Sequence, residues 1–151
     1  MNYEEMLIEA DSEGLIVKEK NIPGYGGRIF KNRIAINRNI ETEIEKSCIL
    51  AEELGHHFTS SGNILDQSVT MNRKQEYRAR LYGYDLKIGL DGLIRAARAG
   101  CHSLFEVAEF LEVTEEYLME ALSCYRSKYG ASVLHNGYEI HFYPQFTISH
   151  P

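Results

Sequence analysis

The segment ILAEELGHH, residues 49–57, holds the side chains best suited to chemistry in this chain. Glu52 and His56 are four residues apart, so on a helix both project from one face within a single turn. Zinc peptidases of the H-E-x-x-H type place two metal ligands at this spacing, with a general-base Glu directly after the first ligand. In this chain Glu52 stands at the first ligand position, His56 at the second, and Glu53 at the position of the base.

The chemistry expected of this arrangement is hydrolysis assisted by a metal ion. Zinc lowers the pKa of a water molecule that it binds to about 7, and a carboxylate at Glu53 would accept the proton. Three protein ligands are usual, and Glu76 on the following predicted helix is the best candidate for the third. Two carboxylates in the ligand set also suit harder ions, so manganese and iron stand as alternatives to zinc.

These residues also have simpler interpretations. Glu52 and Glu53 could form a solvated helix face, and His56 with His57 an ordinary helix end favoured by the helix dipole. His57 could instead support a ligand carboxylate through a hydrogen bond. The spacing of Glu53 and His56 also occurs in di-iron helices, but that architecture needs a second such pair, and the sequence contains none.

The elements that must position these side chains can be predicted from periodicity and caps. Thr42 and Glu45 have the spacing of a capping box at the start of the helix that carries the motif. Residues 28–38 alternate around a possible Lys31-Asn32 turn, which predicts a β-hairpin. Helices are predicted over residues 3–13, 41–58 and 73–88, with a loop over 59–71 and an N-cap at Asn72.

The second half of the chain predicts a run of short helices and a last strand. Caps at Asp91, Ser103 and Thr114 each open a helix, and residues 104–126 match the spacing of a helix-turn-helix. The predicted fold class is α+β. Its predicted parts are a zincin-like core with a small antiparallel sheet (1–89), a helical, helix-turn-helix-like module (90–130) and a C-terminal strand that returns to the core (131–151).

Charge argues against direct binding of nucleic acid. The whole chain carries 16 basic and 22 acidic residues, a formal net charge of −6. Residues 88–128 carry four basic and seven acidic residues, and the would-be recognition helix begins with Thr114-Glu115-Glu116. Carboxylates there would repel phosphates, so this module is expected to pack or to dock a protein.

Composition indicates the class of protein and the cellular compartment to expect. The content is 44% hydrophobic and 25% charged, as in globular proteins, and no apolar run approaches the length of a membrane span. The N-terminal segment is acidic and lacks the pattern of a secretory signal. Three widely spaced cysteines disfavour a disulfide framework, so we expect a cytoplasmic protein without membrane contact.

Two stretches together resemble the ImmA/IrrE family of metallopeptidases from bacterial phages and integrative elements. They are RIAINRNIETEIEKSCILAEELGHHFTSSGNI (33–64) and RKQEYRARLYGYD (73–85), and the terminal YEIHFYPQFTI (138–148) is similar to the closing strand of short phage-type members. By matching positions, the resemblance implies that His56 and Glu76 are zinc ligands and Glu53 is the catalytic base. Most of the family has His where this chain has Glu52, and the preserved spacing favours Glu52 as a substitute ligand.

The resemblance also implies a function. The better-known members of the ImmA/IrrE family cleave a helix-turn-helix repressor of their own mobile element and so relieve repression. We therefore expect a zinc-dependent endopeptidase whose substrate is one protein partner, with an extended segment pairing along an edge strand at residues 34–38. The alternative is an antirepressor of little or no catalytic activity that acts by binding, because Glu52 departs from the family pattern.

Overall fold

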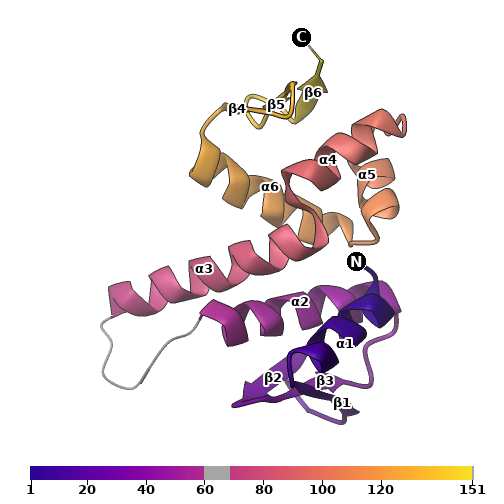
Figure 1. Ribbon diagram of the computed structural model, residues 1–151, viewed down its shortest axis with the longest axis vertical. Coiled ribbons are helices and arrows are strands. Elements are labelled where there is room, and N and C mark those ends of the chain that lie inside the picture. Colours follow the sequence, from indigo (N-terminus) through magenta and orange to yellow (C-terminus); the bar gives the residue numbers. More distant parts are fainter. Residues whose placement is uncertain (60–68, 151) are drawn as a thin grey trace. The chain divides into compact units, whose positions relative to one another are not determined.

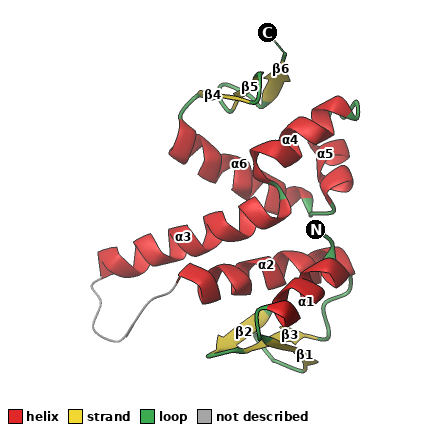
Figure 2. Cartoon of the chain, in the orientation of Figure 1, coloured by secondary structure: helices red, strands yellow, loops and turns green. Residues whose placement is uncertain are grey.

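The computed structural model describes residues 1–59 and 69–150, in two compact units, residues 1–87 and 88–151 (Figure 1). The first unit contains α1 (Tyr3–Ser12), β1 (Ile16–Lys20), β2 (Gly27–Phe30), β3 (Arg33–Asn37), α2 (Glu43–Thr59) and α3 (Val69–Lys87). The second contains α4 (Gly89–Arg98), α5 (Leu104–Leu111), α6 (Glu115–Tyr129), β4 (Ser132–His135), β5 (Tyr138–His141) and β6 (Thr147–Ser149). Helices and strands occur in separate blocks, and the fold is α+β as predicted (Figure 2).

The sheet of the first unit has the strand order β1-β3-β2. The predicted hairpin is confirmed, since β2 and β3 pair antiparallel around Lys31 and Asn32, and Lys31 adopts the left-handed conformation (φ 54°). The expectation of a wholly antiparallel sheet is wrong, because β1 pairs parallel with β3. The chain leaves β1, passes the end of β3 and enters β2 on the other side, which makes β3 the central strand.

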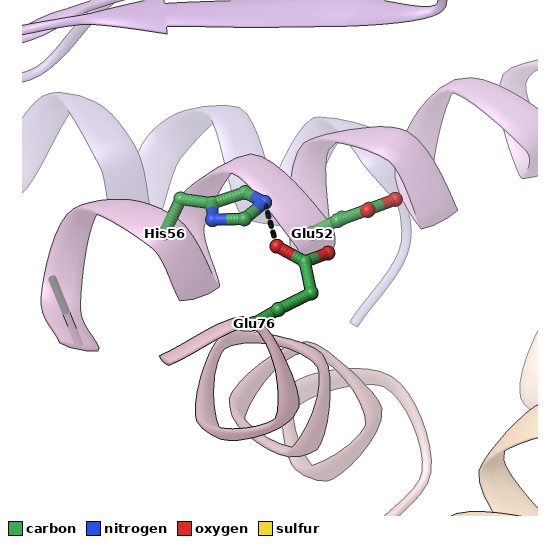
Figure 3. Close-up of side chains that lie close together, drawn as sticks. All are labelled: Glu52, His56 and Glu76. Atoms are coloured by element: carbon green, nitrogen blue, oxygen red, sulfur yellow. Dashed lines mark ion pairs between the residues drawn. The ribbon is translucent and has the colours of Figure 1, made fainter. Parts of the chain in front are cut away.

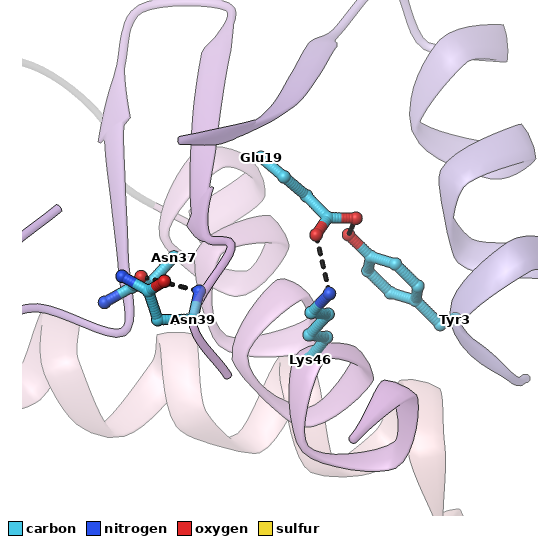
Figure 4. Close-up of polar contacts among 5 residues, drawn as sticks. All are labelled: Tyr3, Glu19, Asn37, Asn39 and Lys46. Carbon is cyan, nitrogen blue, oxygen red and sulfur yellow. Dashed lines mark hydrogen bonds and ion pairs between the residues drawn. The ribbon is translucent and has the colours of Figure 1, made fainter. Parts of the chain in front are cut away.

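Asn37 explains how this crossover is held. Its side-chain amide donates to the carbonyls of Ile22 (3.1 Å) and Tyr25 (2.9 Å), which fastens the connection between β1 and β2 to the end of β3. Its side-chain oxygen accepts from the backbone N–H of Asn39 at 3.0 Å (Figure 4). One amide thus satisfies several backbone groups of a turn, which asparagine does well.

The core of the first unit lies between the sheet, α1 and α2. Ile34 and Ile36 point inward from β3, and Leu50 and Leu54 meet them from α2, each at most 2% exposed. At the rim, the Glu19 carboxylate accepts from the Lys46 ammonium (2.6 Å) and the Tyr3 hydroxyl (3.2 Å), which links β1, α2 and α1 (Figure 4). Burial, and then the charge of Glu19, raise the pKa of Tyr3 to about 12.

The helices of the second unit begin at two of the predicted caps. The Ser103 hydroxyl accepts from the N–H of Glu106 (3.1 Å) and the Thr114 hydroxyl from the N–H of Tyr117 (3.0 Å). The prediction for Asp91 is wrong. It lies in the first turn of α4, where its carboxylate accepts from Asn136 (2.9 Å) and contacts His135 (2.9 Å) on the turn between β4 and β5.

Two other predictions differ from the structure. The helix expected over 73–88 begins earlier, at Val69, so Asn72 lies inside α3 rather than capping it, while most of the loop predicted over 59–71 lies outside the described residues. The single strand expected to return to the core over 131–151 is instead three strands, β4, β5 and β6, which pair with one another as a separate sheet. The turn at Asn136-Gly137 explains this, since both residues take positive φ and close a hairpin.

No helix in the described part of the chain is both long enough and apolar enough to cross a membrane.

Candidate metal centre

Three side chains from two helices converge at one place. Glu52 and His56 project from α2, Glu76 faces them from α3, and their potential ligand atoms all lie within 4.8 Å of one another (Figure 3). His56 Nε2 is 3.6 Å from Glu76 Oε2. Each side chain is partly exposed, so the cluster is open to solvent on one side. The structure therefore brings the two residues predicted from their spacing, Glu52 and His56, together with Glu76, which was predicted from its place on the following helix.

Glycines allow the two helices to approach closely enough for this convergence. Gly55 lies against Ala79, and a Cβ at Gly55 would clash with the backbone carbonyl oxygen of Ala79. Gly83 lies against Ala51 in the same way, with a hypothetical Cβ 3.0 Å from the Ala51 carbonyl oxygen. Glu52 follows Ala51 by one residue on α2, so it stands at the margin of this backbone contact.

Glu53 faces a different direction from its neighbour. Its side chain is turned toward β2, and the residue is only 9% exposed. Burial raises the pKa of its carboxyl, His56 opposes that shift, and the nearby carboxylates of Glu52 and Glu76 add to it. A buried carboxylate with a raised pKa is a better proton acceptor at neutral pH than an exposed one, which suits a general base.

Arg80 holds the third carboxylate in place. Its Nε donates to Glu76 Oε1 at 3.2 Å, one helical turn along α3. Burial lowers the pKa of Arg80, but the hydrogen bond and the charge of Glu76 together outweigh it, so the pKa is raised. Arg80 was not predicted, although the i, i+4 spacing of Glu76 and Arg80 is a signal that can be recognised in the sequence. The arrangement leaves Oε2 of Glu76 facing His56.

The edge strand nearest the cluster is β2. The strand expected to receive an extended substrate, residues 34–38, is not an edge, because β3 is flanked by β1 and β2. A Cβ at Gly27 in β2 would lie 3.2 Å from Cγ of Glu53, so the absence of a side chain there brings β2 against α2. The Asn37 N–H bonds the Gly26 carbonyl (2.7 Å), and by the alternation of an antiparallel ladder the backbone groups of Gly27 point away from β3.

His57 lies beside the cluster on α2, and its ring meets Phe58 edge-on with centroids 4.8 Å apart. Phe58 in turn stacks on Tyr82 of α3 (5.4 Å). These contacts give His57 a packing partner at the end of α2. A supporting role for His57 toward a ligand stays a prediction.

The donor set fits a zinc ion. Two carboxylates and an imidazole are all ordinary zinc ligands, and two donors on one tetrahedral zinc lie about 3.4 Å apart. The separation of His56 Nε2 and Glu76 Oε2, 3.6 Å, is close to that value. Carboxylates also bind manganese and iron, so the residues do not select one metal among these.

Comparison with known families supports the metallopeptidase interpretation. A family model described as Peptidase_M78, the IrrE N-terminal-like domain, matches residues 10–123 of the 151. The match includes all of α2 and α3 and therefore the whole candidate metal centre. No curated protein and no solved structure matches the chain significantly.

Proposed function

Because the chain belongs to the Peptidase_M78 family and carries its metallopeptidase-like domain, we propose that it is a metal-dependent endopeptidase, with zinc as the ion. The observation that carries this proposal is the convergence of Glu52, His56 and Glu76 within 4.8 Å, beside the buried Glu53. Convergence of three ligand side chains at a helix pair, with a proton acceptor at the next residue, is the arrangement that metal-assisted hydrolysis needs.

The residues divide into ligands and an acid–base group. Glu52, His56 and Glu76 would hold the ion, which when bound would supply Lewis acidity toward water and toward a substrate carbonyl. Glu53 takes a proton from the attacking water and passes it to the leaving amine, and its raised pKa serves both transfers. Arg80 positions Glu76 through the hydrogen bond at Oε1.

The substrate segment binds along β2 as an added strand. The backbone groups of Gly27 point to the free edge, and Gly27 lies next to Glu53, so a paired segment passes the acid–base group. From the family resemblance, the partner is a helix-turn-helix repressor encoded by the same mobile element. Cleavage of that repressor would relieve repression.

A binding-only antirepressor is the second candidate, and the residue at position 52 favours it. Two carboxylates in the ligand set lower the net charge of the centre by one unit compared with two histidines and one carboxylate. That reduces the Lewis acidity available to the substrate. A protein with this fold and reduced peptidase activity would still be able to bind and sequester a repressor.

Metal content decides whether the centre is built to bind an ion. We expect the purified wild-type protein to hold about one zinc per chain. Glu52→Ala, His56→Ala and Glu76→Ala should each lose most of it. Glu45→Ala, which removes an exposed carboxylate from the first turn of α2, is the matched control and should keep it. A folded wild type without metal after zinc dialysis would contradict the proposal.

Cleavage then separates the two candidates. Glu53→Gln should keep the metal and the fold but lower repressor cleavage by about 10²- to 10⁴-fold, the usual contribution of a general base. Derepression in cells that survives Glu53→Gln and chelation would assign the protein to the binding-only function instead. Cleavage undiminished in that variant would exclude Glu53 as the base.

A further inference from the structure

The sheet of the first unit presents a second functional surface, on the side opposite α2. Side chains alternate along the strands, so Ile34 and Ile36 face the core while their neighbours face outward. We call this outward side the basic face. Its members are Ile16, Lys18 and Lys20 of β1, Arg28 and Phe30 of β2, and Arg33 and Ala35 of β3.

The basic face is hollowed and partly apolar. A shallow cavity of about 330 Å³ lies over it, with the small side chain of Ala35 among its lining residues. Phe30 is 71% exposed and Ile16 43% exposed at the ends of two outer strands, so both offer apolar surface to another molecule. The cavity is large enough for one or two side chains of another molecule.

The segment that forms the sheet is positively charged, although the chain as a whole is negatively charged. Residues 16–40 contain six basic residues and one acidic residue, a net charge of +5, whereas the whole chain carries −6. The one acidic residue, Glu19, faces the other side of the sheet, where Lys46 and Tyr3 hold it. Among the described residues, no carboxylate forms an ion pair with Lys18, Lys20, Arg28 or Arg33.

We propose that the basic face docks an acidic segment of a protein partner, with an apolar side chain of that segment seated in the cavity that Phe30, Ala35 and Ile16 help to line. Four cations on three neighbouring strands provide charge complementarity to closely spaced carboxylates, and arginine binds carboxylates through two hydrogen bonds at once.

The size and setting of the face favour a protein over a nucleic acid. A strand of four or five residues spans about 15 Å, which a short peptide segment covers, whereas a long polyanion would extend over the acidic remainder of the chain. The choice of a protein also rests on the proposed function. Arg28 and Phe30 belong to β2, the strand in which Gly27 lies against Glu53, so a partner held on this face contacts the strand along which the substrate segment is proposed to bind.

A peptide array tests this without requiring catalysis. The Glu53→Gln protein is applied to an array of random peptides of about 12 residues, long enough to span a strand. We expect retained peptides to be enriched in Asp and Glu next to a large apolar residue. Raising the salt from about 0.05 to 0.5 M should weaken their binding about tenfold.

Matched charge variants locate the binding on the face. Arg28→Gln with Arg33→Gln should weaken binding of the retained peptides about tenfold, as should Phe30→Thr. Arg95→Gln with Arg98→Gln removes the same charge from exposed positions of α4 and should leave binding unchanged. Circular dichroism of each variant excludes loss of fold as the cause.

Three outcomes would overturn the proposal. The first is an array without acidic enrichment, or equal losses in the α4 control. The second is a single-stranded oligothymidine of similar charge that binds more tightly than any peptide and is lost in the Arg28→Gln, Arg33→Gln protein, which would assign the face to nucleic acid. The third is a wild-type dimer in sedimentation that this double variant dissociates, which would assign the face to a second copy. Because these experiments measure binding and not cleavage, their results can be interpreted even if the protein proves not to be a peptidase.

Discussion

The two compact units pack their helices by different means. In residues 1–87, α2 and α3 meet backbone to backbone at Gly55 and Gly83. In residues 88–151, each of the helices α4, α5 and α6 buries leucine side chains, among them Leu93, Leu111 and Leu118. The buried polar or charged residues of the described chain, Ser47, Glu53 and Lys87, all belong to the first unit.

This difference shows which unit carries a functional constraint. Burial of a carboxylate and close approach of two helices both cost stability, and neither is needed to form a helical pair. They occur together where Glu52, His56 and Glu76 converge. The second unit has an apolar core, and its helices α5 and α6 have side-chain caps, the arrangement expected where packing alone determines the structure.

Glycine substitutions should show the largest difference in stability between the two units. Gly55→Ala forces a Cβ into the Ala79 carbonyl and should destabilise the protein by about 3 kcal/mol, and Gly83→Ala, with a gentler contact, by about 1–2 kcal/mol. Gly92→Ala in α4 meets only a flexible methyl of Leu111 at 3.3 Å and should be neutral or stabilising by up to about 1 kcal/mol. Urea unfolding measures all three, and equal costs would contradict the contrast.

Glu53 should reduce stability in the metal-free protein. Because burial raises its pKa, the folded state holds the proton more tightly than the unfolded chain, whose carboxyl titrates near 4.5. Its contribution is therefore fully favourable below that pH and is lost as pH rises through the raised value. Glu53→Gln should stabilise the metal-free protein by about 1 kcal/mol at pH 7.

The gain should shrink toward pH 4, which thermal unfolding across that range would show. The matched control is Glu45→Gln on the exposed start of α2, which should change stability little at either pH. A gain independent of pH would indicate that packing, rather than charge burial, is responsible.

The caps of the second unit should have moderate and local effects. Ser103→Ala and Thr114→Ala each remove an acceptor from a helix N-terminus and should cost about 1 kcal/mol. Ser123→Ala inside α6 is the control, since an exposed mid-helix serine contributes little and alanine favours the helix. Hydrogen exchange should show faster opening of α5 and α6 with zinc affinity unchanged. A loss of zinc in these variants would mean that the units are not independent.

The smallest effect is expected at Glu19. The hydrogen bond from Lys46 lowers the pKa of Glu19, so its contribution is present above the ordinary value of 4.5 and is lost as pH falls below it. The pair is partly exposed and therefore screened, so Glu19→Gln should cost about 0.5 kcal/mol at pH 7. The difference from wild type should vanish near pH 3. A difference of constant size at both pH values would rule out the charge as its source.

Local sequence signals predicted much of the fold correctly. The caps at Ser103 and Thr114 and the turn of the β2–β3 hairpin depend on a few adjacent residues, and each is confirmed. The i, i+4 spacing of Glu52 and His56 likewise placed both on one helix face. Helical and turn periodicities are properties of short segments, so a single sequence is enough to read them.

What failed depends on contacts between distant segments. The parallel pairing of β1 with β3, and hence the identity of the edge strand, depends on contacts such as those of the Asn37 amide with the carbonyls of Ile22 and Tyr25. The helix α3 begins at Val69, three residues before the local cap signal at Asn72, so that signal did not set the helix start. The small residues Ala79 and Gly83, four apart on α3, were a readable signal of close helix approach that the sequence analysis left unused.

The backbone contact at Gly55 has a mechanical consequence for the metal centre. Where two helices meet through long side chains, rotamer changes allow the distance between the helices to vary by about an ångström or more. At Gly55 and Ala79 no side chain separates the two helices. The distance from Glu52 and His56 to Glu76 is therefore set by direct contact between the backbones of α2 and α3. Substitutions elsewhere in the core should therefore change the stability of the unit long before they change the spacing of its donors.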